Sequence, residues 1–274
     1  GGQGDFRAVE EGVLGCPCCH ALRSISRVVD GVDAVRLAVR EELRKGATQI
    51  KVMAGGGIAG GVPIHRSHFS MGELCAAVEE AQACDTYVMA HAYSPESIRR
   101  CIEAGVRTIE HGNLVDDATA SLMAERGAFM VPTLAVYEGY HKHAAEIGVA
   151  PRIVETIPPL LKKGQHAIEI CRSAGVKIGL GTDLEGILHP YHLRELVLRN
   201  EVQSAAEIIA SATVINAEIL QMAGKLGVVS PGALADLLVV EGNPLRDLDV
   251  LQGEGRHLRA IMKNGALFKN ELAS

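Results

Sequence analysis

The chain has 274 residues and a net charge of -6, with 47% hydrophobic, 22% charged and 3% aromatic residues. This length suits one large domain or two modest ones of an ordinary globular protein. The acidic balance argues against nucleic acid or an anionic membrane surface as a partner, and no apolar run is long enough for a membrane span.

The main part of the chain alternates predicted helices with predicted strands. Helical apolar spacing occurs over residues 32–45, 70–84, 94–104, 116–126, 152–174, 192–200 and 204–222. Short apolar runs typical of strands occur at residues 49–54, 86–91, 106–111, 128–134 and 176–183. Ser70 and Glu73 form a capping box, and Pro95 stands in the first turn after Ser94. This alternation predicts a parallel sheet and an α/β fold.

The residues after about position 224 change character. They contain apolar strand patterns at 236–240 and 258–268, and the dipeptide Asn264-Gly265 is a strong hairpin signal. These patterns predict β-structure outside the parallel sheet. We therefore divide the chain into residues 1–224 and residues 225–274.

The seven cysteines are an odd number and are scattered, which favours a reducing compartment. We expect a cytoplasmic protein, although the chain opens without Met and any targeting signal would lie upstream. Cys16, Cys18, Cys19 and His20 form one cluster. It lacks the second ligand pair of a zinc knuckle, so we interpret it as a bent loop with free thiols.

Polar residues of metal-ligating or acid–base type follow four predicted strands: Lys51, His91, His111 and Asp183. Reactive groups in parallel α/β folds lie at the carboxyl ends of strands. One such histidine is more often a structural group, whereas four residues from different strands indicate a site. Imidazoles and carboxylates bind zinc and similar ions well. Lys51 can be a ligand only after carbon dioxide converts its amine to a carbamate.

Four motifs in this order resemble the amidohydrolase superfamily, and especially its imidazolonepropionase-like branch with the Xaa-Pro dipeptidases. They are Lys51-Val52-Met53-Ala54-Gly55-Gly56-Gly57, Ala90-His91-Ala92, Ile109-Glu110-His111-Gly112 and Gly181-Thr182-Asp183. The run Gly232-Ala233-Leu234-Ala235-Asp236-Leu237-Leu238-Val239-Val240 is similar to the small β-sandwich domain of that superfamily. The resemblance covers essentially the whole chain.

The resemblance implies a partial (β/α)₈ TIM barrel, from about the fourth strand to the eighth, followed by the C-terminal part of a β-sandwich domain. The family's His-x-His pair on the first strand is absent. His141 and His143 have that spacing but lie in a polar, helical-looking stretch. We therefore expect a larger parent protein, and we expect this open-edged segment alone to be poorly stable and inactive.

The resemblance also implies two divalent ions, usually zinc in this family. Lys51 matches the carbamylated lysine that bridges both ions, and His91 and His111 match the histidines that hold the second ion. Asp183 matches the aspartate that ligates the first ion and acts as the catalytic proton acceptor.

Three residues are candidates for substrate contact. Gln3 stands where close relatives have a histidine, so it can keep a neutral hydrogen bond but no charge. Tyr137 matches a tyrosine expected near a substrate carboxylate, although it can equally be a loop aromatic that covers the core. His189 lies in a turn after the eighth strand, within reach of a substrate. His65 and His68, in a polar loop over the mouth, are more simply interpreted as solvated loop residues.

The implied reaction is hydrolysis of a peptide or amide bond in a small carboxylate-bearing substrate, such as an Xaa-Pro dipeptide. A metal-bridging hydroxide would attack the carbonyl, and Asp183 would pass a proton to the leaving nitrogen. A cyclic amide, a lactone or an N-acyl aromatic amino acid is an alternative substrate, because loops set the pocket. An inactive fragment is the other alternative. We expect no nucleic-acid or membrane partner, and a homo-oligomer at full length.

Overall fold

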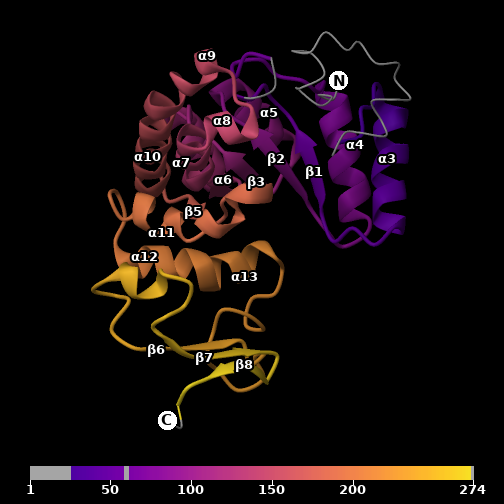
Figure 1. The fold of residues 1–274 in the computed structure, drawn as a ribbon. Helices are drawn as coiled ribbons and strands as arrows, with labels where there is room; N and C mark the ends of the chain where they lie inside the picture. Colours follow the sequence, from indigo (N-terminus) through magenta and orange to yellow (C-terminus); the bar gives the residue numbers. More distant parts are fainter. Residues whose placement is uncertain (1–25, 59–61, 273–274) are drawn as a thin grey trace.

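The computed structural model describes residues 26–58 and 62–272. Gln3 and the cysteine cluster around residues 16–20 lie outside the described residues, so their predicted roles stay predictions. Within the described part, five parallel strands form one sheet in the order β1-β2-β3-β4-β5 (Figure 1). They are β1 (Ile50–Met53), β2 (Val88–Ala92), β3 (Thr108–His111), β4 (Phe129–Val131) and β5 (Lys177–Ile178). The predicted α/β class with a parallel sheet, consistent with part of a TIM barrel, is confirmed.

Helices alternate with the strands. Most helices cover one face of the sheet (Figure 1), whereas the last packs through Ile219 against Tyr87 and Phe129 on the opposite face. They are α3 (Val32–Arg44), α4 (Met71–Gln82), α5 (Pro95–Ala104), α6 (Asp117–Glu125), α7 (Leu134–Lys142), α8 (Ala144–Ile147), α9 (Pro151–Val154), α10 (Ile157–Ser173), α11 (Arg194–Arg199), α12 (Ala205–Ala210) and α13 (Asn216–Ile219). The capping box of Ser70 with Glu73 is present, and Ser94 caps the helix in which Pro95 comes first. None of the helices in the described ranges is long and apolar enough to cross a bilayer.

The two faces of the sheet have different cores. The outer face and the covering helices bury branched apolar side chains such as Ile98, Ile109 and Ile168, all with no exposed surface. Burying one such side chain stabilises the fold by about 1.5–3 kcal/mol. The inner face carries a smaller cluster that includes Tyr87 and Phe129. Side chains alternate between faces along a strand, so the polar residues of the inner face share it with this cluster.

The strand predicted over residues 128–134 is wrong at its end, because β4 stops at Val131. Pro132 has no N–H for the next ladder bond. Thr133 has φ 50, and α7 begins at Leu134, inside the predicted strand. Helix α7 is therefore an element that sequence periodicity did not predict.

The strand predicted over residues 176–183 is also shorter than expected. Asn216 in α13 accepts a hydrogen bond from the Leu180 N–H at 2.9 Å and donates one to the Leu180 carbonyl at 2.9 Å. These bonds take the place of strand pairing. A Cβ on Gly179 would lie 2.5 Å from Ile219 Cδ1, so glycine permits this close approach of α13.

Two predicted helices are interrupted. The stretch 152–174 contains α9 and then α10, because Pro158 and Pro159 lack N–H groups and fit only the first turn of a helix. The stretch 204–222 contains α12 and α13, joined through a π-helical turn, η2 (Ser211–Ile215). Short 3₁₀ segments, η1 (Gly186–Tyr191) and η3 (Leu248–Leu251), complete the described helical structure.

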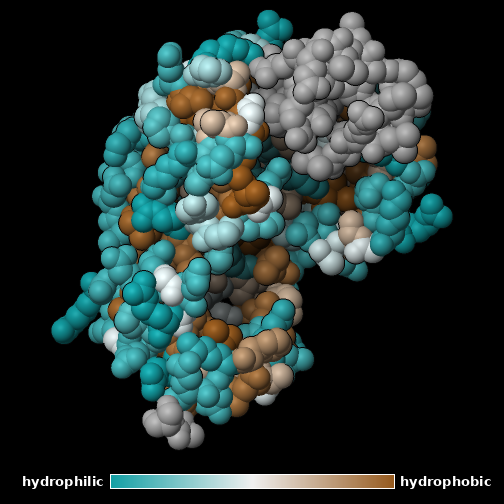
Figure 2. Space-filling view, in the orientation of Figure 1, coloured by the Kyte–Doolittle hydropathy of each residue, from teal (hydrophilic) through white to brown (hydrophobic). Residues whose placement is uncertain are grey.

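The C-terminal residues form an antiparallel sheet of three strands, β6 (Leu237–Val240), β7 (Leu258–Lys263) and β8 (Ala266–Asn270). Asn264 and Gly265 make the predicted hairpin, with φ 48 and φ 80. Apolar surface is visible in the lower part of the molecule in Figure 2. In this sheet, Leu238 and Phe268 are 56% and 73% exposed. The described residues contribute one layer here, so the sandwich and the boundary at 224 stay predictions.

Candidate metal-binding active site

Two histidines and one tyrosine form a ring cluster at the carboxyl edge of the parallel sheet. The ring centroids of His91 in β2 and His111 at the end of β3 lie 4.5 Å apart. Tyr93, just after β2, stacks on His111 with centroids 5.0 Å apart and planes 7° from parallel. His91 is 7% exposed, and His111 and Tyr93 are each 2% exposed. The structure therefore brings together two of the predicted metal ligands in a buried setting.

Three successive strand ends carry a non-glycine residue in the left-handed backbone region. His111, the last residue of β3, has φ 74, Thr133, two residues after β4, has φ 50, and Asp183, five residues after β5, has φ 54. This conformation costs an L-residue with a side chain about 1–3 kcal/mol. At His111 it departs from the extended backbone that would keep strict strand alternation. Such strain clusters at functional sites, and it adds Thr133 to the residues found from the sequence.

The Thr133 hydroxyl fixes the orientation of the His111 ring. Nδ1 of His111 lies 2.7 Å from the Thr133 Oγ1. The other ring nitrogen, Nε2, lies 4.0 Å from Oδ2 of Asp183. A hydrogen bond at one imidazole nitrogen sets which nitrogen remains for a ligand. Sequence reasoning missed Thr133, although a threonine directly after Pro132 at a strand end was a visible signal.

The loop after β1 reaches the His91 ring. His91 Nε2 lies 3.0 Å from the Gly56 carbonyl oxygen. A Cβ on Gly57 would lie 3.2 Å from the His91 Cε1, so the glycine run allows backbone to pass close to the ring. Glycine has no Cβ, and it is therefore suited to this close approach of the backbone to the ring.

Burial keeps both imidazoles neutral. It lowers the pKa of His91 to about 4 and lowers the pKa of His111 well below its ordinary value. Loss of hydration raises the pKa of the Asp183 carboxyl, and the charge of Lys51 lowers it in part. Neutral imidazole is the form that binds metal ions, so the histidines are in the ligand form at neutral pH.

Lys51 lies closer to the amino end of the sheet than the two histidines do. It is the second residue of β1 and pairs in register with Met89, two residues before His91. Its side chain is exposed, and its ammonium has no hydrogen-bond or ion-pair partner in the part of the chain that the structure describes. Its charge nevertheless contributes to the pKa values of both histidines and of Asp183. Lys51 therefore faces the same site.

Glu110 is a further acidic residue at the site that sequence reasoning did not single out. It pairs in register with His91 and is 6% exposed. The Thr108 hydroxyl donates a 2.7 Å hydrogen bond to its carboxyl group. Burial raises the pKa of Glu110, and the charge of Lys51 lowers it. Glu110 was named from the sequence only as part of the motif around His111, because neighbouring residues of a strand are expected to point to opposite faces.

Tyr137 lies in α7 with no exposed surface. Its hydroxyl is 3.0 Å from the Tyr93 hydroxyl and 2.8 Å from Asn113 Oδ1. Asn113 in turn donates to the Leu160 carbonyl at 3.0 Å. The structure thus links Tyr137 to the ring cluster through Tyr93, and its predicted substrate contact stays a prediction.

The other histidines named from the sequence lie further out. His189 is exposed in η1, and its carbonyl accepts a 2.8 Å hydrogen bond from His192 Nδ1. His65 is exposed in the loop after β1, whereas His68 Nδ1 lies 3.1 Å from the Met53 carbonyl. That bond gives His68 a structural contact at the base of the loop. A substrate role for His189 stays a prediction.

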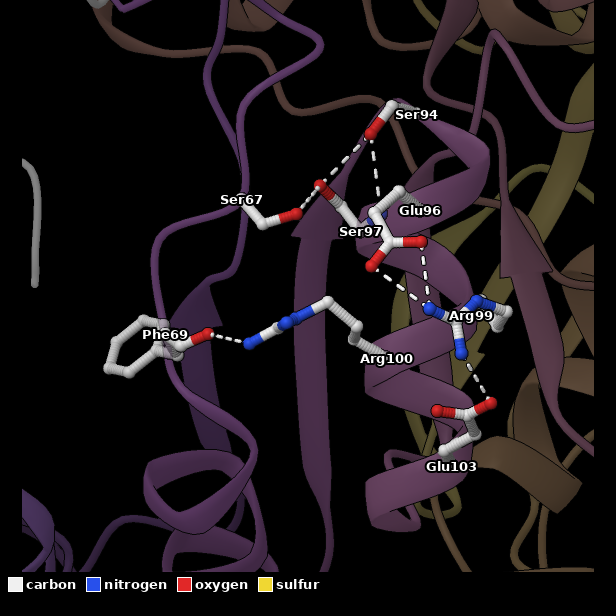
Figure 3. Close-up of polar contacts among 8 residues, drawn as sticks. All are labelled: Ser67, Phe69, Ser94, Glu96, Ser97, Arg99, Arg100 and Glu103. Atoms are coloured by element: carbon white, nitrogen blue, oxygen red, sulfur yellow. Dashed lines mark hydrogen bonds and ion pairs between the residues drawn. The ribbon is translucent and has the colours of Figure 1, made fainter.

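Side-chain hydrogen bonds tie the loop after β1 to helix α5 (Figure 3). The Ser67 and Ser97 hydroxyls are 2.9 Å apart, and the Ser94 hydroxyl donates to Ser97 at 3.0 Å. Arg100 donates to the Phe69 carbonyl at 2.5 Å. The loop that carries the Gly56 carbonyl is therefore anchored on the helix that follows β2.

The sequence model of the amidohydrolase family matches residues 3–267. The chain belongs to the amidohydrolase family. The ochratoxinase of Aspergillus niger is 33% identical over 244 residues, which are 88% of this chain and 50% of the relative. This amidohydrolase chain therefore spans about half the length of that relative.

Two solved structures extend the comparison. A prolidase complexed with N-methylphosphonate-L-proline is 50% identical, with a TM-score of 0.92 over 98% of this chain and 66% of the other. An Xaa-Pro dipeptidase with methionine in its active site is 32% identical, with a TM-score of 0.79 over 89% of this chain and 60% of the other. The resemblance to the amidohydrolase superfamily is thereby confirmed.

The donor groups of this amidohydrolase fit a divalent ion in their chemistry. Imidazole nitrogens and carboxylate oxygens are both zinc donors. His111 Nε2 and Asp183 Oδ2, which the resemblance assigns to different ions, lie 4.0 Å apart, and the two ions of such sites lie about 3.5–4 Å apart. In the described ranges, no three His, Cys, Asp or Glu side chains are grouped closely enough to hold an ion. A fuller ligand set therefore needs Lys51, which is a ligand only as a carbamate.

Proposed function

We propose that this amidohydrolase contributes to metal-dependent hydrolysis of a peptide or amide bond in a small carboxylate-bearing substrate, such as an Xaa-Pro dipeptide. The observation that carries the proposal is that neutral His91, neutral His111 and Asp183 lie together at the carboxyl edge of the sheet, where His111 and Asp183 have strained backbones. The likeness at 50% identity to a prolidase complexed with a proline derivative supports the substrate class.

The residues that would hold the metal are His91, His111 and Asp183, with Lys51 as a carbamate. Two zinc ions are the cofactor that we propose for the full-length protein. A divalent ion there would polarise the scissile carbonyl and lower the pKa of the attacking water. The surrounding contacts that keep His111 and Asp183 in strained backbone, such as the Thr133 hydroxyl at His111, would hold the side chains in place before the ion arrives.

Asp183 would act as the general base and then as the general acid. Its carboxylate lies beside His111 and is 48% exposed, so it can reach both the protein site and an incoming substrate. Loss of hydration raises the pKa of this carboxyl above its ordinary value, which strengthens it as a base. It would take a proton from the attacking water and give it to the leaving nitrogen.

The first experiment is the metal content per chain, measured by elemental analysis after purification with zinc and bicarbonate. We expect bound zinc that is lost in His111→Ala and Lys51→Ala variants. An Asp183→Asn variant should bind zinc but turn over no dipeptide. Zinc content that is unchanged in the His111 and Lys51 variants would refute the proposed site.

A second candidate is hydrolysis of a cyclic amide, a lactone or an N-acyl aromatic amino acid. The similarity to the A. niger ochratoxinase favours keeping it, because the same metal residues would serve either substrate. A panel of Xaa-Pro dipeptides, N-acyl phenylalanines and lactones distinguishes the two. A chain that binds metal but cleaves none of these would support the inactive-fragment alternative.

A further inference from the structure

Helix α7 has an unusual beginning. Thr133 occupies its N-cap position, where threonine normally has an extended backbone and its hydroxyl accepts from the first-turn N–H groups. Here Thr133 has φ 50 and makes no side-chain cap hydrogen bond. Its hydroxyl lies instead 2.7 Å from Nδ1 of His111. The N-terminus of α7 therefore lacks its usual cap, and the residue that would supply it serves His111.

Glu195, in the distant helix α11, supplies the missing cap. Its Oε2 accepts a 2.7 Å hydrogen bond from the Ala135 N–H in the first turn of α7. A carboxylate at this end of a helix is favoured by the exposed N–H groups and by the helix dipole. Next to Glu195, Arg194 binds both carboxylate oxygens of Glu138 in α7, at 2.8 Å and 2.9 Å. Two adjacent residues of α11 thus form hydrogen bonds or ion pairs with α7.

The setting of Glu195 is costly for a purely structural contact. The residue has no exposed surface, and its Oε1 has no hydrogen-bond partner within the described ranges. Burial raises the pKa of Glu195 to about 7, although the charge of Arg199 and the backbone N–H groups of Ala135 and Leu134 lower it in part. An unpartnered buried carboxyl oxygen destabilises a fold, and such a group is commonly retained where it sets geometry at a functional site.

The same helix also holds the strand end that carries Asp183. Arg199, four residues after Glu195, has no exposed surface and donates to the Gly179 carbonyl at 2.8 Å. Gly179 follows β5 directly and precedes Asp183 by four residues. Helix α11 therefore contacts the start of α7, two residues after Thr133, and the backbone four residues before Asp183.

We infer that Glu195 is a positioning residue for His111. By capping α7 from α11, it releases the Thr133 hydroxyl and holds Thr133 where that hydroxyl accepts the Nδ1–H of His111. Nε2 of His111 is then unprotonated and faces Asp183. That this tautomer presents Nε2 to a metal ion rests on the proposed function. The tautomer itself can be measured in the metal-free protein.

The test is the tautomer of His111 in the metal-free 274-residue chain. It is measured at pH 8 from long-range ¹H–¹⁵N couplings of the imidazole, assigned with a His111→Gln variant. The wild-type chain should show one tautomer, protonated at Nδ1. Glu195→Ala and Thr133→Ala should each give a mixture of both tautomers, whereas Glu195→Gln, which keeps an acceptor for Ala135, should retain the wild-type signal.

Glu138→Gln is the matched control, because it weakens the same α7–α11 interface without touching the cap. It should leave the tautomer unchanged. A single Nδ1–H tautomer in Glu195→Ala, or an equal change in Glu138→Gln, would overturn the inference. If Glu195→Ala does not fold, Thr133→Ala and Glu195→Gln still decide: the inference fails if Thr133→Ala keeps the wild-type tautomer or Glu195→Gln loses it.

Zinc affinity, measured by competition with a chromophoric chelator, gives a second readout. Loss of an outer partner of a ligating histidine typically weakens binding about 10–100-fold, and we expect this of Glu195→Ala. Glu195→Gln should change affinity less than about 3-fold. An affinity in Glu195→Ala equal to wild type would count against the inference. Zinc binding that is insensitive to His111→Gln would instead refute the proposed function and leave the tautomer result to decide the inference.

Discussion

The two ends of the parallel sheet both carry charged residues but use them differently. At the amino end, Arg107 donates to the Glu218 and Ile219 carbonyls of α13, at 2.7 Å and 3.3 Å. Its guanidinium also lies 5.1 Å from the centre of the Phe129 ring. Lys177 binds both carboxylate oxygens of Glu218, at 2.6 Å and 2.7 Å. Each cation there has a partner, and cations at a helix C-terminus are stabilising.

At the carboxyl end the polar groups are strained or unpaired. His111, Thr133 and Asp183 have left-handed backbones, and the Lys51 ammonium has no bonding partner among the described residues. In TIM barrels, polar residues at the amino face serve stability and those at the carboxyl face serve chemistry. The difference between the two ends indicates that the amino end of this sheet serves stability and the carboxyl end serves chemistry. Substitutions at each end can test this assignment.

The largest effect should follow substitution at the carboxyl end. His111→Ala removes a proposed ligand and should weaken zinc binding more than the roughly 100-fold typical of outer partners. The free energy of unfolding without metal should change less than at the amino end, where Arg107 ties α13 to the sheet. His166→Ala is the control, since His166 is 71% exposed and lies far from the strand edge in sequence. Equal zinc affinity in both variants would contradict the division.

Substitution at the amino end should have the opposite profile. Arg107→Ala removes two hydrogen bonds to helix carbonyls and the contact with the Phe129 ring, and should lower the free energy of unfolding by about 2–3 kcal/mol. Urea unfolding measures this change, and zinc affinity should stay at the wild-type value. Arg172→Ala is the control on an exposed arginine, with an expected loss of about 0.5 kcal/mol. An Arg107→Ala chain with wild-type stability but without bound zinc would contradict the assignment of stability to the amino end.

Stability should depend on pH with opposite signs at two buried groups. Burial lowers the pKa of His91 from 6.5 to about 4, so the folded chain binds fewer protons than the unfolded chain between these values. Stability from His91 therefore rises with pH through this window. Burial raises the pKa of Glu195 from 4.5 to about 7, so the folded chain binds more protons there, and stability from Glu195 falls as pH rises.

Urea unfolding from pH 4 to pH 8 separates the two contributions. His91→Gln should remove a rising component of roughly 3 kcal/mol, and Glu195→Gln should remove a falling component of similar size. The wild-type curve minus each variant curve isolates each group. A difference curve for His91→Gln that falls with pH would show that its ring is protonated in the folded chain.

The sequence predicted the elements whose signals are local. The capping box at Ser70 and the hairpin at Asn264-Gly265 depend on neighbouring residues, and both are present. The four strand residues were found by their place after apolar runs. Thr133 and Glu195 were missed, because Thr133 contacts His111 on another strand and Glu195 contacts a helix 60 residues away, and neither contact has a local sequence signal. Strand lengths also failed where Asn216 replaces β-pairing at Leu180.

The smallest expected effect concerns the loop that carries Gly56 to the His91 ring. Ser97→Ala removes the hydroxyl that lies 2.9 Å from Ser67 and should lower the free energy of unfolding by no more than about 1 kcal/mol. The effect should be local, because the loop otherwise depends on backbone bonds and on Arg100. Hydrogen exchange should therefore accelerate at the amides of Gly56 and His68 while the amides of β2 stay protected.

Arg99→Ala provides the matched control on the same helix. Arg99 pairs with Glu96 and Glu103 on the exposed side of α5, away from the contacts that Ser97 and Arg100 make with the loop (Figure 3). It should leave exchange at Gly56 and His68 unchanged. Faster exchange in both variants would mean that α5 as a whole, and not the serine contact, holds the loop. Faster exchange in Ser97→Ala alone would show that the serine contact stabilises the loop. It is this loop that carries the Gly56 carbonyl, the hydrogen-bond partner of the His91 ring that we propose as a metal ligand.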